Sequence, residues 1–117
     1  MSEKLIRSCC EKGSVLDEVL ASLPSYEQVN ELAMILQALS DPTRLKIVLA
    51  LQRYEMCVGE IANMLKASPS NTSHQLKILR MAKIVTYKKE AQMYFYRLAS
   101  QKVKTLISDL IRMNNGK

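Results

Sequence analysis

Apolar residues recur at helical spacing through the first part of the chain. Between residues 25 and 39 they fall three and four positions apart, which places them on one face of a helix. These residues are Val29, Leu32, Ala33, Leu36 and Leu39. A shorter apolar pattern over residues 14–23 stops at Pro24, which cannot continue a helix. The pattern therefore predicts a short first helix over 14–23 and a longer second helix that Ser25 caps.

Two junctions further along pair a capping residue with proline, Asp41-Pro42 and Ser68-Pro69. The side-chain oxygens of Asp and Ser accept free backbone N–H groups of a first helical turn, and proline fits the first helical position. Apolar residues continue at helical spacing after each junction and also between them. The sequence therefore predicts three further helices, over 42–52, 58–65 and 69–83.

The pattern changes from helical to extended at Ile84. Residues 84–87 and 93–98 are rich in β-branched and aromatic side chains, and residues 88–92 separate them, which predicts a β-hairpin. A final helix over 100–113 is expected from its apolar stripe. That stripe comprises Val103, Leu106, Ile107, Leu110 and Ile111.

This order of elements predicts a mostly α fold with a β-hairpin (α+β). It is typical of a winged helix-turn-helix flanked by an N-terminal and a C-terminal helix. The length suits one domain over 1–117. Within it we expect a flexible arm over 1–13, the helix-turn-helix over 58–83, the wing over 84–98 and the last helix over 100–113.

A helix-turn-helix that binds DNA places the start of its second helix in the major groove. Small polar side chains there can approach base edges, and cations further along can meet phosphates. The candidates on the helix are Ser70, Asn71, Ser73, His74, Lys77 and Arg80, and those at the expected wing tip are Lys88, Lys89 and Gln92. Each of these residues could instead be an ordinary surface residue. Lys88 and Lys89 could also protect the edge of a strand from pairing with another chain.

The placement of charge supports the interpretation as a DNA-binding surface. The net charge is +6. Residues 66–97 carry seven Lys and Arg against Glu90 alone, whereas residues 1–65 carry more acidic than basic side chains. A basic segment centred on the second helix and the wing is expected where a surface meets phosphates. The alternative is a winged helix used for protein–protein contact, which would not require this charge.

Three collinear stretches, residues 39–47, 68–80 and 94–98, resemble signature stretches of the ArsR/SmtB family of metal-sensing repressors. The resemblance covers roughly residues 30–113. It implies a homodimer held by the first and last helices, and a double-stranded operator with imperfect dyad symmetry and half-sites about one helical turn apart. The chain departs from the family at the wing tip, where Ala91 stands in place of a frequent glycine. Alanine does not adopt positive φ cheaply, so we expect a turn of another type or a longer one.

The three cysteines are Cys9, Cys10 and Cys57, an odd number that argues against a disulfide framework. The resemblance implies two possible metal sites. One uses Asp and His on the last helix, which here has Asp109 but no histidine. The other starts at a Cys-Val-Cys stretch, of which Cys57-Val58-Gly59 keeps the first cysteine. Our hypothesis is a site of Cys9, Cys10 and Cys57, or of Cys57 and only one of the adjacent pair, within or between subunits. The inducer would be a thiophilic ion: Cd(II), Pb(II), As(III) or Zn(II). Thiol redox sensing and no thiol role are the alternatives.

Other classes of protein find little support in the sequence. There is no run of about 18 apolar residues that would span a membrane, and residues 1–10 lack the apolar stretch of a secretory signal, so we expect a cytoplasmic protein that does not bind membranes. There is a single histidine, His74, and no phosphate-binding glycine loop or paired-carboxylate motif. We therefore expect neither an enzyme nor an organic cofactor.

Overall fold

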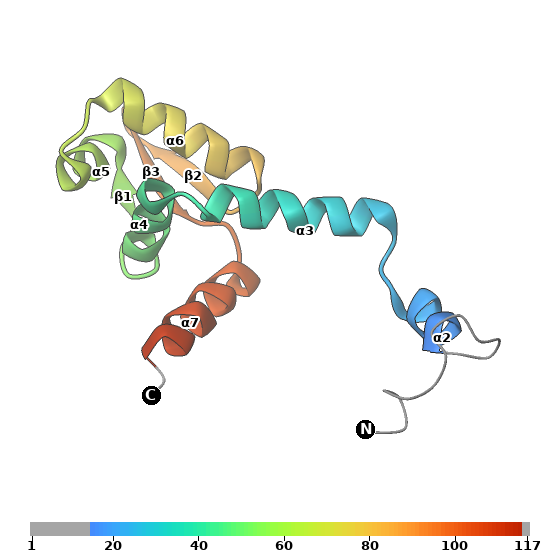
Figure 1. Ribbon diagram of the computed structural model, residues 1–117. Coiled ribbons are helices and arrows are strands. Elements are labelled where there is room, and N and C mark those ends of the chain that lie inside the picture. The colour runs from blue at the N-terminus through green and yellow to red at the C-terminus, as the bar shows by residue number, and fades with distance from the viewer. Residues whose placement is uncertain (1–14, 116–117) are drawn as a thin grey trace. The chain divides into compact units, whose positions relative to one another are not determined.

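The structure is a computed structural model that describes residues 15–115. Its helices and strands follow one another as the apolar pattern predicts, with one strand added (Figure 1). In chain order the elements are α2 (Val15–Ser22), α3 (Tyr26–Leu39), α4 (Pro42–Leu51), β1 (Met56–Cys57), α5 (Val58–Leu65), α6 (Pro69–Met81), β2 (Val85–Glu90), β3 (Met93–Leu98) and α7 (Gln101–Asn115).

The chain falls into two compact units, whose boundary lies between Glu31 and Leu32. In the first unit, Ser25 and Gln28 form a reciprocal cap. The backbone N–H of Ser25 donates to Oε1 of Gln28 over 2.9 Å, and the N–H of Gln28 donates to Oγ of Ser25 over 3.1 Å. The second unit contains every element from α4 to α7. The single domain predicted over 1–117 stays a prediction.

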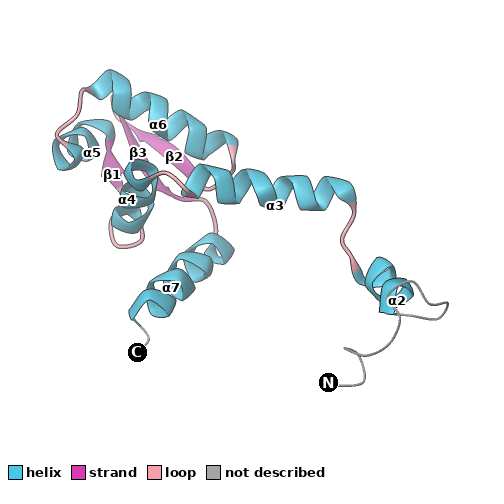
Figure 2. Ribbon diagram, viewed as in Figure 1, coloured by secondary structure: helices cyan, strands magenta, loops and turns pink. Residues whose placement is uncertain are grey.

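A three-stranded antiparallel sheet lies in the second unit, in the order β1–β3–β2 (Figure 2). The hairpin was predicted, and β1 was not. Met56 pairs with Tyr96 and Cys57 with Phe95. Since β1 is only two residues long and its partner is almost forty residues away, no local pattern signals it.

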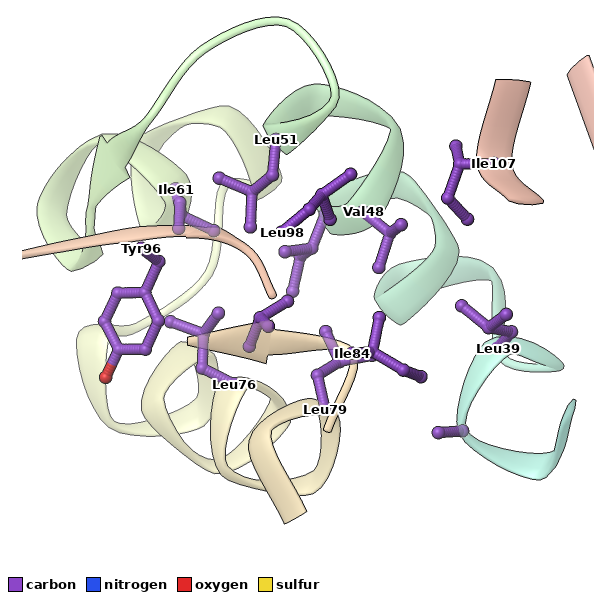
Figure 3. Close-up of a cluster of buried hydrophobic side chains, with 13 residues drawn as sticks. Leu39, Val48, Leu51, Ile61, Leu76, Leu79, Ile84, Tyr96, Leu98 and Ile107 are labelled. Carbon is purple, nitrogen blue, oxygen red and sulfur yellow. The ribbon is translucent and has the colours of Figure 1, made fainter. Parts of the chain in front are cut away.

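One apolar core joins the helices of the second unit to the sheet. Figure 3 shows side chains of α4, α5, α6, β3 and α7 converging on it. The fully buried members include Ile47, Val48, Ile61, Leu76, Leu79, Ile84 and Ile107. Because α6 contributes Leu76 and Leu79 to this core, one of its faces is fixed against the protein and the opposite face is left to solvent.

Both predicted cap-and-proline junctions are confirmed. The Asp41 carboxylate accepts a hydrogen bond from the backbone N–H of Arg44 over 3.0 Å, and Pro42 opens α4. The Ser68 hydroxyl accepts from the N–H of Asn71 over 3.0 Å, and Pro69 opens α6. Each side chain satisfies an N–H group that has no partner within its helix.

The end of α6 differs from the prediction. The helix ends at Met81 rather than at Lys83, which takes a positive φ of 62°. The N–H of Ile84 donates to the carbonyl of Leu79, and the N–H of Lys83 to that of Arg80. This is a Schellman ending, and it directs the chain from α6 into β2.

The turn of the wing also differs from the prediction, in length and in conformation. We expected residues 88–92 to separate the strands, but β2 continues through Glu90, which pairs with Met93. Only Ala91 and Gln92 form the turn, and Ala91 has a φ of 56°. The expectation that Ala91 avoids positive φ is therefore wrong. Because all six residues of β2 pair with β3, only two residues remain for the turn, and the loop is not longer.

Replacing Ala91 by glycine is expected to raise the free energy of unfolding by about 1 kcal/mol, because glycine takes positive φ without a Cβ penalty. Denaturant unfolding measures the change at a fixed protein concentration. Ala99→Gly is the control, since Ala99 has no positive φ and glycine only adds chain entropy there. A loss of stability in Ala91→Gly as large as in Ala99→Gly would contradict the strained turn.

Candidate DNA-binding surface

The connection between α5 and α6 consists of only residues 66–68. Lys66 closes α5 with a positive φ of 56°, and the N–H of Ala67 donates to the carbonyl of Ala62 over 3.0 Å. This ending turns the chain sharply, and Ser68 caps the next helix at once. A short turn of this kind lets α5 support α6 from behind, as a helix-turn-helix requires.

The two faces of α6 separate as predicted. Thr72, Leu76 and Leu79 are buried. The opposite face presents all six predicted side chains of the helix to solvent, namely Ser70, Asn71, Ser73, His74, Lys77 and Arg80. The small polar residues lie in the first two turns and the cations further along. The helix therefore offers hydrogen-bonding groups at its N-terminal end, where a recognition helix approaches bases.

The wing places its two lysines on opposite faces of the sheet. Lys88 pairs with Phe95 and Lys89 with Tyr94, and successive side chains of a strand point to opposite sides. Lys89 shares its face with Tyr87, which lies beside Arg80 of α6. The prediction that both lysines lie at the wing tip with Gln92 is wrong, because β2 extends through them; Gln92 alone is in the turn.

Lys88 has acidic neighbours on its own face. Its amino group lies 3.9 Å from Oε1 of Glu55 and 3.5 Å from Oε2 of Glu90. The other oxygen of Glu55 lies 3.9 Å from the guanidinium of Arg97. These exposed ion pairs add little stability. They do reduce the positive potential around Lys88, which makes it the weaker of the two candidates for a phosphate contact.

Arg44 connects α4 to α6, a contact that the sequence did not predict. Its Nε donates to the carbonyl of Ala38 over 2.8 Å, and its Nη1 donates to Oε1 of Gln75 over 3.1 Å. Gln75 lies on α6, on the border between its buried and exposed faces. The guanidinium therefore fixes α6 relative to the end of α3 through charge-assisted hydrogen bonds.

Comparison with known proteins identifies the family. The family model described as "Bacterial regulatory protein, arsR family" matches residues 41–87. The transcriptional repressor SmtB homolog of Synechocystis is 37% identical over 80% of this chain and 70% of its own length. The chain belongs to the arsR family.

Further members of the arsR family are similar over most of the chain. The cadmium resistance regulatory protein CadC homolog of Staphylococcus aureus is 39% identical over 66% of this chain and 64% of its own length. The solved structure of HlyU from Vibrio cholerae, a transcriptional activator, is 35% identical with a TM-score of 0.70, over 76% of this chain and 97% of that one. A homodimeric winged helix-turn-helix domain from Mycobacterium bovis is 23% identical with a TM-score of 0.74, over 80% and 90% of the two chains, and supports the fold alone.

The predicted winged helix-turn-helix fold is thus confirmed, and the chain is a transcriptional regulator rather than an enzyme. None of the helices within residues 15–115 is both long and apolar enough to cross a membrane.

Of the three cysteines of this arsR-family chain, the structure describes Cys57. It is half-buried at the end of β1, directly before α5, and its backbone N–H donates to the Glu60 carboxylate over 3.0 Å. Cys9 and Cys10 lie outside the described residues. Residues 15–115 contain no group of three His, Cys, Asp or Glu side chains placed to hold a metal ion. The described part of the chain therefore supplies at most one thiolate of the predicted site.

Proposed function

We propose that the chain is a repressor that binds operator DNA as a homodimer, with α6 in the major groove and the wing against the neighbouring backbone. One observation carries this proposal: the exposed face of α6 bears hydrogen-bonding side chains at its start and cations further along. Ser70, Asn71, Ser73 and His74 would then approach bases. Lys77, Arg80, Lys89 and Gln92 would contact phosphates and sugars, with a smaller part for Lys88. Such a regulator works beside the chromosome, in the cytoplasm.

The last helix supports a dimer. On α7, Leu106, Leu110 and Ile111 are each 37% exposed. Together with Leu45 and Leu49 of α4, the latter two border an apolar groove of about 510 Å³. A second copy of the chain would remove this apolar surface from water. The similar Mycobacterium bovis domain is homodimeric, and a symmetric dimer implies an operator with dyad symmetry.

Selection of binding sequences from a random duplex library, with the full-length chain, tests this function. We expect a two-fold symmetric consensus with half-sites about 10 base pairs apart, because a dimer places its two recognition helices one helical turn apart. An asymmetric consensus, or no enriched sequence, would contradict the dimeric operator-binding mode.

The second part of the proposal is that a thiophilic ion, bound through Cys9, Cys10 and Cys57, releases the operator. Cys57 directly precedes the first helix of the helix-turn-helix, so a ligand at its thiolate would act at the start of α5. The CadC homolog, which carries cadmium resistance in its name, supports a metal inducer. The donor set of thiolates suits Cd(II), Pb(II), As(III) or Zn(II).

The affinity of the protein for the selected operator, measured by titration with and without each ion under reducing conditions, tests the inducer. We expect about 5- to 150-fold weaker binding in the presence of the effective ion, the usual range of coupling between two sites. Cys57→Ser is expected to abolish this effect and to leave ion-free affinity unchanged. Weakening by a mild thiol oxidant, with no response to any ion, would favour the redox alternative; no response to either would refute thiol sensing and leave DNA binding intact.

A further inference from the structure

Three tyrosines form a row on the face of the wing that carries Lys89. The ring centroids of Tyr87 and Tyr94 are 5.1 Å apart at an interplanar angle of 84°, and that of Tyr96 is 5.3 Å from Tyr87. Tyr96 is 8% exposed, whereas Tyr87 and Tyr94 are 38% and 43% exposed. The row therefore starts in the core and runs outward along the sheet, through a tilted contact between Tyr96 and Tyr87 and an edge-to-face contact between Tyr87 and Tyr94. Edge-to-face contacts are favourable for aromatic pairs.

A cation lies over each of the two exposed rings. Cζ of Arg80 is 5.2 Å from the centroid of Tyr87, and Nζ of Lys89 is 5.6 Å from that of Tyr94. Both distances are within the range of cation–π attraction. Arg80 comes from α6 and Lys89 from β2, so the row links the recognition helix to the wing.

No carboxylate in the described part of the chain neutralises either of these cations. Within residues 15–115, Arg80 and Lys89 form no ion pair with a carboxylate, whereas Lys88 and Arg97 on the other face do. An aromatic ring attracts a cation without cancelling its charge and leaves N–H donors free on the side away from the ring. Two long side chains are thus held in place with their charge available to a ligand.

We infer that Tyr87 and Tyr94 are positioning residues that hold Arg80 and Lys89 ready for two phosphates of bound DNA. This inference rests on the proposed function and adds to it the residues that order the phosphate contacts. Long flexible side chains lose rotational freedom when a ligand immobilises them. Side chains that are already held lose less, so each ring is expected to strengthen DNA binding about 2- to 10-fold.

A double-mutant cycle between Tyr94 and Lys89 tests the inference, with the full-length chain and a fluorescein-labelled 30-base-pair duplex of mixed sequence at low salt. Tyr94→Leu is expected to weaken binding about 2- to 10-fold and to have no further effect in the Lys89→Met background, because the ring acts through the lysine. Tyr94→Phe keeps the ring and is expected to bind as the unmodified chain does. Lys88→Met, one position away on the opposite face, is the matched control and is expected to weaken binding less than Lys89→Met.

Thermal melting of each variant separates positioning from a purely structural role. Tyr94 is exposed close to the turn of the wing, so Tyr94→Leu is expected to melt close to the unmodified chain. The inference would be overturned if Tyr94→Leu weakened duplex binding equally in the unmodified chain and in the Lys89→Met background. It would also be overturned if Tyr94→Phe weakened binding as much as Tyr94→Leu. Either result would leave DNA binding established. Failure of the unmodified chain to bind the duplex would instead refute the proposed function, and the inference with it.

Discussion

Asn71→Ala is expected to weaken binding to the selected operator by about 1–3 kcal/mol per contacted base pair, which is about 5- to 150-fold for each of the two half-sites. Asn71 is exposed in the first turn of α6, where its backbone N–H is already bound by Ser68. Its side chain is exposed and forms no hydrogen bond within residues 15–115, so the amide is available to pair with adenine through two hydrogen bonds. Binding to a duplex of mixed sequence is expected to change little. Fluorescence anisotropy with the two duplexes, at one salt concentration, measures both affinities.

Lys77→Ala is the matched control on the same exposed face of α6. A phosphate contact carries no sequence information, so this variant is expected to weaken both duplexes by a similar factor. The slope of log affinity against log salt is expected to become shallower by about 1.8, because each subunit of the dimer loses one phosphate contact and each contact contributes about 0.9. If the two variants change the ratio of specific to non-specific affinity equally, the division between base-reading and phosphate-binding residues is wrong.

Leu76→Ala is expected to lower the free energy of unfolding by about 2–5 kcal/mol. Leu76 has no exposed surface and belongs to the same core cluster as Ile61, Leu79 and Tyr96 (Figure 3). Removing its side chain leaves a cavity where α6 packs against the rest of the unit, and surrounding atoms fill such a cavity only in part. Denaturant unfolding at a fixed protein concentration measures the loss, because dimerisation contributes to apparent stability.

Thr72→Val is the control for the loss of stability in Leu76→Ala, because Thr72 lies on the same buried face of α6. Within residues 15–115 the hydroxyl of Thr72 has no hydrogen-bond partner, and the residue has no exposed surface. Valine removes this unsatisfied group and keeps the shape, so stability is expected to stay the same or to rise by up to about 1 kcal/mol. A loss of several kcal/mol in Thr72→Val, or of less than 1 kcal/mol in Leu76→Ala, would contradict this description of how α6 is held.

The recognition helix was predictable because its signals are local. Ser68 and Pro69 mark its start, and the spacing of Thr72, Leu76 and Leu79 fixes its buried face. The exposed face then follows from helical geometry alone. The end of the helix was less predictable, since Lys83 closes it in a conformation that glycine usually adopts.

The wing was predictable as a hairpin but not in its register. Lys88, Lys89 and Glu90 have low strand propensity, so the sequence placed them in a loop; pairing with residues 93–95 of β3 outweighs that propensity. The opposite placement of the two lysines follows from this register. The bond between Arg44 and Gln75 spans 31 positions, and the row of tyrosines depends on the same strand pairing, so neither could be read from neighbouring residues.

The salt dependence of duplex binding by the full-length chain tests the central claim most directly. If α6 and the wing meet DNA with their cations, log affinity falls linearly with log salt, with a slope of about −0.9 for each phosphate contacted. Several contacts per subunit predict a steep line. An affinity that does not change with salt, or no binding to any duplex at low ionic strength, would contradict the account.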